Sequence, residues 1–234
     1  AKKAGIQHIN YSYNQSSIVG IFKHEIPHES EAVQIFLPSG PLAILPLSGN
    51  RSSFVWTNET NEAVRIFNLN DLHFSNELNT AFQNRRGQIQ LESKKNMFPI
   101  SLTIPKKVTK ERFVIIGDTA HKIHPIAGQG LNLGIRDVAA LAEVLILSRR
   151  LGEDIGSRLV LNKYSKWRNL DVTSVVFFTN FANKIFSNDN FLKKFSTGIG
   201  FKLLNESKTI KNYFISEASG LSGDIPKLLK GCKL

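Results

Sequence analysis

Residues 117–137 read GDTAHKIHPIAGQGLNLGIRD, and this stretch decides how the rest of the chain is interpreted. It is preceded by four apolar residues at 113–116, three of them β-branched, which predict a buried strand of a parallel sheet over 112–118. From about 131 to 150, apolar residues recur at three- and four-residue spacing, on enough positions for a helix buried on most sides. The stretch therefore joins a strand to a helix.

The residue types in this loop suit a polar ligand with hydroxyl and carbonyl groups. Asp118 is expected at the carboxyl edge of the sheet, where open α/β sheets bind ligands, and its carboxylate can accept hydrogen bonds from a polyol. Gly128 and Gly130 let the backbone approach closely, and the first N–H groups of the next helix suit a phosphate or an electron-rich carbonyl. Taken alone, these glycines are also compatible with a simple turn before a helix. Neither a Walker loop nor a Gly-x-Gly-x-x-Gly fingerprint is found in the sequence.

The stretch resembles the second flavin-binding motif of the flavoprotein aromatic-ring monooxygenases. Within them it is similar to the ubiquinone-biosynthesis hydroxylases, most of all to the 2-polyprenyl-6-methoxyphenol hydroxylase branch. Residues 24–28, 40–47 and 55–57 resemble the substrate-domain sheet of that branch, and residues 219–226 resemble its C-terminal ending. The resemblance implies an α+β or α/β fold, the C-terminal part of a p-hydroxybenzoate-hydroxylase-like flavoprotein. Such a part has an antiparallel substrate-domain sheet, a remnant of the parallel sheet of the FAD domain, and C-terminal helices.

The resemblance also implies a division of the chain. Residues 1–105 would form the substrate-binding sheet domain with a helical insert, residues 106–150 the C-terminal part of the FAD-binding domain, and residues 151–234 basic, Phe-rich helices. The N-terminal Rossmann βαβ unit of the family is absent. Because the chain begins Ala1-Lys2-Lys3 without methionine, we interpret it as a fragment whose N-terminal part is missing.

Local patterns give the expected elements of the first domain. Short β-prone runs separated by turn residues predict an antiparallel meander of strands at 16–23, 33–37, 42–47 and 52–57, with a further strand at 98–104. Between them, residues 62–86 are expected to be helical, with Gly87 as the C-cap. Two or three amphipathic helices are expected between 151 and 218.

By resemblance, FAD is the cofactor and NAD(P)H the reductant. Asp118 would hold the ribityl chain, Pro125 would lie against the ring, and the backbone from Gly128 to Asn132 would contact the pyrimidine edge. The full set of expected flavin contacts is Gly117, Asp118, Pro125, Gly128, Gln129, Gly130, Leu131 and Asn132. Pro46 and Leu47 would provide an apolar cover for the substrate. The implied reaction is hydroxylation of a polyprenylated phenol through a flavin C4a-hydroperoxide, and no catalytic acid or base can be named.

Charge is concentrated toward the C-terminus. The chain carries a net charge of +11, and from residue 158 onward 13 basic residues stand against five acidic ones, among half of all phenylalanines. This combination suits an anionic membrane surface, although a solvated basic face over a Phe core fits equally well. We expect a cytoplasmic protein peripheral to the inner membrane, in contact with a polyprenyl-phenol substrate and with other ubiquinone-biosynthesis proteins. No sequence pattern for nucleic-acid binding is present.

Other kinds of site receive less support. His121 and His124 could be grouped with Asp118 as metal ligands by their spacing. The sequence offers no third strong ligand nearby to go with the two histidines, so no metal is expected. His24 and His28 are expected on a solvated surface, and Cys232 is the single cysteine, so no intrachain disulfide can form. Two other functions stay open. One is a truncated, non-catalytic fragment that serves as a membrane-associated binding or scaffold module. The other is a related flavoprotein hydroxylase of another aromatic compound.

Overall fold

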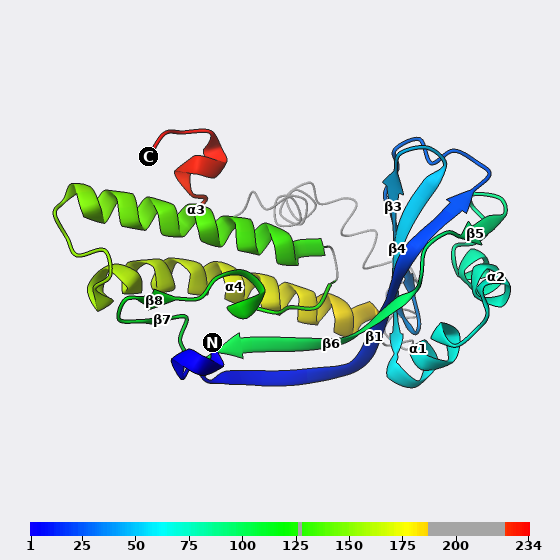
Figure 1. The fold of residues 1–234 in the computed structure, drawn as a ribbon, viewed down its shortest axis with the longest axis horizontal. Coiled ribbons are helices and arrows are strands. Elements are labelled where there is room, and N and C mark those ends of the chain that lie inside the picture. The colour runs from blue at the N-terminus through cyan, green and yellow to red at the C-terminus, as the bar shows by residue number, and fades with distance from the viewer. Residues whose placement is uncertain (126–127, 187–222) are drawn as a thin grey trace, which may run out of the picture. The chain divides into compact units, whose positions relative to one another are not determined.

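The computed structural model of the chain describes residues 1–125, 128–186 and 223–234, and these form two compact units (Figure 1). The helical unit comprises Ala1–Tyr11 and Ser101–Ala182 together with 223–234, and the sheet unit comprises Ser12–Ile100 with 183–186. Strands β1 (His8–His24) and β6 (Asn96–Pro105) each contribute residues to both units.

The sheet unit is built on the strand order β2-β3-β4-β1-β5, with β6 also paired to β1. The remaining strands are β2 (Val33–Leu37), β3 (Gly40–Leu47), β4 (Arg51–Glu59) and β5 (Ile89–Leu91). The expected antiparallel meander is confirmed for β2, β3 and β4. The first strand is placed differently from a simple meander, because β1 pairs with β4 and lies inside the sheet rather than beside β2.

Two helices, α1 (Thr60–Phe67) and α2 (Asp71–Ala81), cover one face of this sheet. Alternate strand residues such as Phe22, Phe54 and Trp56 pack with residues of both helices into one buried core. The expected helical character of residues 62–86 is confirmed for most of the segment, but it is divided between these two helices. Asn70 interrupts it, because its side chain accepts a hydrogen bond from the His73 N–H at 2.9 Å and so begins a new helix. Gly87, with φ of 73°, lies in the turn before β5 rather than at a helix end.

The helical unit centres on α3 (Gln129–Arg150) and α4 (Arg158–Phe186), which pack through Ala140, Val144 and Tyr164 (Figure 1). Before α3, this unit contains a short hairpin and two 3₁₀ turns. The hairpin pairs β7 (Thr109–Lys110) with β8 (Phe113–Val114), and the turns are η1 (Lys2–Ala4) and η2 (Gly117–Thr119). The C-terminal turn η4 (Lys227–Lys230) is attached to α3, because the Lys227 N–H donates to Glu143 at 2.8 Å.

Two expectations for this unit need correction. The parallel-sheet strand over 112–118 is reduced to Phe113–Val114, paired antiparallel with β7. The Ile115 N–H still donates to the Val108 carbonyl at 3.0 Å, but no strand pairing in the described chain continues past Val114, and Ile116 is 36% exposed. The helix over 131–150 is confirmed as α3, but it is not buried on most sides, since Leu131, Ile135 and Val138 are exposed.

Of the C-terminal helices expected between 151 and 218, α4 is the one that falls within the described residues. Residues 187–222, with several of the tail's basic and Phe residues and part of the 219–226 block, lie outside the described residues. Within the described ranges, none of the helices combines the length and apolarity that crossing a bilayer requires.

Candidate functional site

Asp118 is presented by the tight turn η2. Gly117 adopts φ of 59°, which favours glycine, and its carbonyl accepts hydrogen bonds from the N–H groups of Ala120 and His121 at 2.8 and 2.9 Å. The Gly117 N–H in turn donates to the carboxylate of Asp137 at 2.9 Å. These bonds fix the turn at both ends, so the exposed Asp118 carboxylate projects from an anchored backbone.

The N-terminus of α3 lies beside this turn. Its N-cap is Gly128, with φ of 64°, and no side chain among the described residues caps this end. A Cβ built on Gly130 would lie 4.0 Å from Oδ1 of Asp118, and one built on Gly128 would meet nothing within 4 Å. The structure thus brings Asp118 to an uncapped helix start with open space around it, which offers acceptor oxygens and N–H donors side by side.

The remaining expected flavin contacts lie just before this N-terminus and in the first turn of α3. Pro125, Leu131 and Asn132 are exposed, whereas Gln129 is buried. Residues 126 and 127, between Pro125 and Gly128, lie outside the described residues.

The two expected substrate contacts do not share a face. In the β3–β4 register Pro46 lies opposite Ser52 and Leu47 opposite Arg51, so the two side chains point to opposite sides of the sheet. Pro46 is on the side covered by α1 and α2, and Leu47 is on the open side. On that open side, Val19, Ile21 and Val55 line a groove of about 540 Å³.

A buried ionic network lies directly behind the turn. Asp137 accepts hydrogen bonds from Nε2 of His121 and from Nε of Arg168, both at 2.6 Å. Arg168 also donates to Asp171, which forms a second ion pair with Arg136 at 3.0 Å. This network was not expected from the sequence. The one local signal for it is the adjacent pair Arg136 and Asp137 within a largely apolar part of α3.

Burial and hydrogen bonding set the charge states of Asp137 and of two further buried groups in this unit. Burial acts to raise the pKa of Asp137, but hydrogen bonds from His121, Arg168 and Gly117 outweigh it, so the pKa is lowered and the carboxylate stays ionised. Burial raises the pKa of Tyr164, which therefore stays protonated. His124, fully buried nearby in sequence, has its pKa lowered to about 4 by burial and is neutral at pH 7.

The histidines serve other purposes than those considered from the sequence. His121 is bound by Asp137 rather than grouped with Asp118. His24 is not on a solvated surface: it is 5% exposed, and its ring nitrogens bond the Ser52 hydroxyl at 3.1 Å and the Ile26 carbonyl at 2.9 Å. Across the described part of the chain, no three His, Cys, Asp or Glu side chains form a metal-binding group.

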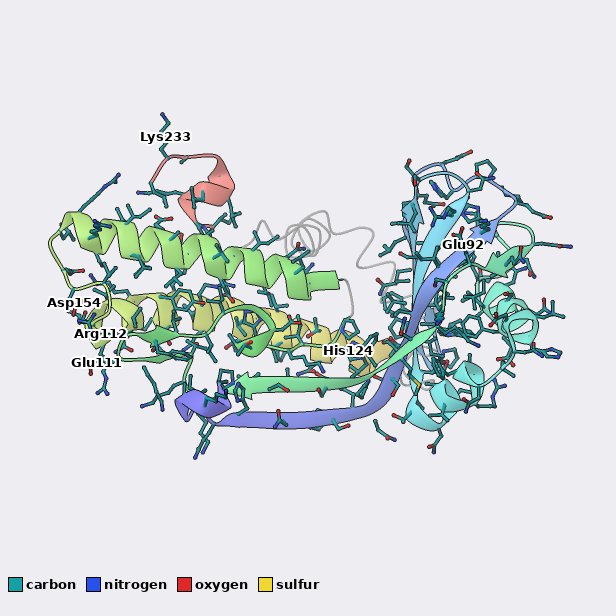
Figure 2. All side chains as sticks on the ribbon, viewed as in Figure 1. Glu92, Glu111, Arg112, His124, Asp154 and Lys233 are labelled. Carbon is teal, nitrogen blue, oxygen red and sulfur yellow. The ribbon has the colours of Figure 1, made fainter. Side chains whose placement is uncertain are left out.

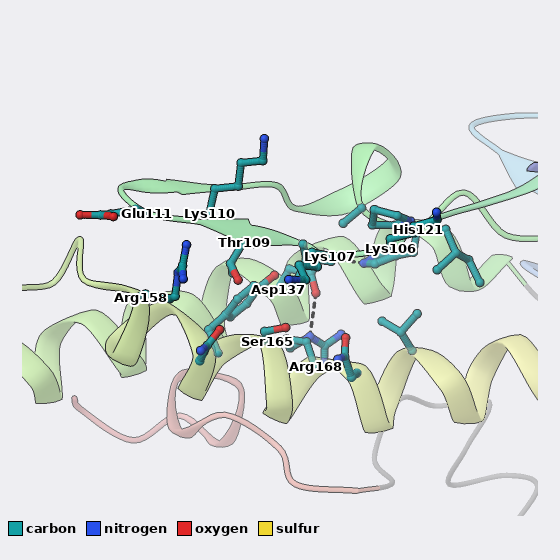
Figure 3. Close-up of a pocket in the computed structure, with 18 residues that line it drawn as sticks. Lys106, Lys107, Thr109, Lys110, Glu111, His121, Asp137, Arg158, Ser165 and Arg168 are labelled. Carbon is teal, nitrogen blue, oxygen red and sulfur yellow. Dashed lines mark hydrogen bonds and ion pairs between the residues drawn. The ribbon is translucent and has the colours of Figure 1, made fainter. Parts of the chain in front are cut away.

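The helical unit also contains a cavity of about 750 Å³ between the β7–β8 hairpin and α4 (Figure 3). Lys106, Lys107 and Arg158 line it, as do Asp137 and Arg168, whose ion pair is the one described above. None of the expected flavin contacts lines it. An ion pair of 2.5 Å between Arg112 and Asp154 holds the hairpin to the loop before α4 (Figure 2).

Comparison with known proteins supports one family. A family model described as FAD binding domain matches residues 5–179. The chain is 35% identical over 236 residues to the ubiquinone hydroxylase UbiL of Rhodospirillum rubrum, which covers 100% of this chain and 55% of that protein. It is 30% identical over 218 residues to the mitochondrial ubiquinone biosynthesis monooxygenase COQ6 of Mus musculus, covering 79% and 46%. The chain thus spans about half the length of the curated relatives it matches.

Solved structures agree on the fold. The p-nitrophenol 4-monooxygenase PnpA of Pseudomonas putida superposes with a TM-score of 0.72 at 16% identity, covering 94% of this chain and 56% of that one. PqsL of Pseudomonas aeruginosa, a probable FAD-dependent monooxygenase, gives 0.67 at 19% identity, covering 83% and 55%. These likenesses confirm the fold class expected from the sequence.

Proposed function

The chain belongs to the FAD-binding-domain family of flavoproteins, and on that premise we propose that it is the flavin- and substrate-contacting part of an FAD-dependent monooxygenase. The proposed reaction is hydroxylation of the aromatic ring of a polyprenylated phenol in ubiquinone biosynthesis. The single observation that carries the proposal is the position of Asp118 beside the uncapped first turn of α3.

The residues at this edge fit the parts of FAD that the family motif contacts. Asp118, held by the Gly117 turn, supplies carboxylate oxygens to the ribityl hydroxyls. The backbone N–H groups from Gly128 to Asn132 supply donors to the carbonyls of the pyrimidine edge, where the helix dipole favours electron-rich oxygen. Gly128 and Gly130 carry no Cβ, so the backbone can come close to a flat ring. Pro125 is exposed next to this edge and is assigned to the ring face.

Bound FAD, reduced by NAD(P)H, supplies the oxygen chemistry, and the side chains of this chain supply position and exclusion of water. The Asp137 network keeps the Gly117 turn anchored and thereby holds the Asp118 carboxylate in place. The apolar groove along Val19 and Val55, with Leu47 on the same open side, is assigned to an aromatic ring bearing an apolar tail. Pro46 faces the other way and is not assigned to the substrate.

The names of the two relatives support the substrate class, since both refer to ubiquinone or its biosynthesis. A polyprenylated phenol partitions into the bilayer, so we infer peripheral contact of this chain with the inner membrane from the cytoplasmic side, among other ubiquinone-biosynthesis proteins. The basic C-terminal portion suits that contact. A hydroxylase of another aromatic compound and a non-catalytic membrane-associated module are the competing functions.

Titration of the purified chain with FAD tests the proposal, followed by the perturbed flavin absorbance band and quenched flavin fluorescence. We expect saturable binding that Asp118→Ala weakens at least tenfold. Asp71→Ala, at an exposed aspartate of α2, should bind like the parent. Equal binding by the two variants would remove Asp118 from the site.

Absence of binding by a folded chain would favour the non-catalytic module. The titration is then repeated with the chain joined to the portion of the Rhodospirillum rubrum relative that it does not match. If that protein also fails to bind FAD, the monooxygenase proposal is wrong. If it binds FAD, turnover of phenols with and without a prenyl tail separates the proposed substrate from other aromatic compounds.

A further inference from the structure

A second groove lies in the sheet unit, on the side covered by helices. It has a volume of about 380 Å³ and lies between the end of β4 and the helices α1 and α2. Trp56 and Asn58 of β4 form its sheet wall, and Ile66 and Ala81 contribute apolar surface from the helices. None of the residues assigned to flavin or to the aromatic substrate lines it.

The sheet wall carries two unsatisfied hydrogen-bond donors. Nε1 of Trp56 and Nδ2 of Asn58 are buried and have no hydrogen-bond partner in the described structure. Their residues are only 4% and 1% exposed, and as residues i and i+2 of one strand they share a face. Buried donors are nearly always paired, so two orphaned donors in the wall of one groove indicate that an acceptor belongs there.

The charges around the groove restrict what that acceptor can be. Glu62 and Glu77 line it, and both are held by Arg65 through hydrogen bonds of 2.7–2.9 Å. No lysine, arginine or histidine is among the described residues that line the groove. With two carboxylates at its wall and no cation to receive it, an anionic ligand is disfavoured.

From these features we propose that this groove binds a small neutral molecule with a carbonyl oxygen on an apolar body. The carbonyl accepts from the Trp56 indole N–H and the Asn58 amide N–H. The body packs against Ile66, Ala81 and the Trp56 ring. The volume is in the range of small-molecule pockets, and a carbonyl has two lone pairs, which matches the number of unpaired donors on this face of β4.

The indole N–H of Trp56 is a direct reporter of this site. The chain has two tryptophans, and the second, Trp167, already donates to the Asp224 carbonyl at 2.9 Å, so it serves as an internal reference. We would record ¹H–¹⁵N spectra of the complete chain during addition of acetophenone, with Trp167→Phe used to assign the two indole signals. The Trp56 signal should move downfield and saturate, and the Trp167 signal should stay in place.

Matched probes and variants isolate the carbonyl contact. Ethylbenzene has the same skeleton without the oxygen and controls for ring-current shifts, and benzoate tests the exclusion of anions. Neither should produce the saturable downfield shift. Asn58→Leu should weaken acetophenone binding about tenfold, the factor for one lost hydrogen bond, and Asn61→Leu, an exposed residue of α1, should leave it unchanged.

The competing explanation is that ordered water alone satisfies the two donors. In that case the Trp56 N–H exchanges magnetisation with a bound water molecule. Failure of acetophenone to displace that water, up to the solubility limit of acetophenone, would overturn the proposal. Equal shifts with ethylbenzene and acetophenone would overturn it as well. Trp56→Phe gives a further check: whatever its melting temperature without a probe, the variant lacks the indole N–H, so acetophenone should no longer raise that melting temperature.

Discussion

Oδ2 of Asp137 lies 2.6 Å from Nε2 of His121, and the two side chains are only 1% and 2% exposed. The same carboxylate accepts from Arg168 of α4 and from the Gly117 N–H. One buried aspartate therefore joins α3, α4 and the turn that carries Asp118. A carboxylate removed this completely from water is stable only while all of its donors stay in place.

Asp137→Asn should be strongly destabilising. The amide keeps the shape of the carboxylate, but it leaves the buried Arg168 charge without a full counterion at this position, and loss of one partner of a buried pair costs about 3–5 kcal/mol. Urea unfolding at pH 7 measures the loss. Asp154→Asn, which breaks the exposed pair with Arg112, is the control and should cost at most about 1 kcal/mol. Similar losses of unfolding free energy for the two variants would show that the buried network stabilises the fold no more than the exposed pair does.

Stability should fall as the pH decreases from about 6.5 to 4. The pKa of His124 is about 4 in the folded chain and 6.5 when unfolded, so in this window the unfolded chain binds the proton that the folded chain excludes. The folded state is therefore favoured most above pH 6.5 and loses roughly 3 kcal/mol as the pH falls through the window. Urea unfolding at pH 7, 6, 5 and 4 measures the slope.

His124→Gln removes the titrating ring and should flatten this profile. His73→Gln, at an exposed position of α2, should retain the slope of the parent. A slope unchanged in His124→Gln would contradict the assignment. Below pH 4 the free energy of unfolding should decrease further in both variants. The lowered pKa of Asp137 means that its stabilising charge is lost only in stronger acid.

The fold was predictable from sequence where the signal is local. The three- and four-residue spacing located α3 to within two residues of its N-terminus, and turn residues separated β2, β3 and β4 correctly. The position of β1 beside β4 was not predictable, because it depends on pairing between residues about 40 positions apart, such as Ser17 and Thr57. The division of residues 62–86 at Asn70 was not expected, because apolar residues at helical spacing lie on both sides of it.

At the candidate site, too, residues with a local role could be predicted from the sequence, and contacts between distant residues could not. Gly128 and Asp118 could be selected from the motif because each is needed for a local geometry or chemistry. Arg168 could not, since its contact with Asp137 spans 31 residues and joins two helices. Pro46 and Leu47 were selected together, although strand alternation places consecutive residues on opposite faces. This opposition could be read from the sequence, because both residues lie within one predicted strand.

The turn between β2 and β3 should depend on glycine at one position. Gly40 has φ of 139°, and a Cβ there would lie 2.4 Å from the Thr57 carbonyl oxygen. Gly40→Ala should therefore cost more than about 3 kcal/mol, since neither backbone can move without breaking the β3–β4 ladder. Gly49→Ala, with φ of 70° and open space around the added carbon, should cost about 1 kcal/mol. Thermal unfolding of the two variants measures the difference, and equal melting temperatures would show that the turn relaxes around the methyl group.

The exposed apolar side of α3 gives the last prediction. Val138 is 55% exposed, whereas Val144 on the same helix is 8% exposed and packs against α4. Periodicity identifies which residues share a face but not what covers that face, so both valines were expected in a core. In this chain Val138→Lys should change the free energy of unfolding by no more than about 0.5 kcal/mol, because the ammonium group stays in water. Val144→Lys should cost at least about 4 kcal/mol, because it buries an unpaired charge. Circular dichroism during urea unfolding distinguishes the two. A large loss from Val138→Lys would mean that this side of α3 is covered in solution, and light scattering on the parent chain would then show whether a second copy provides the cover.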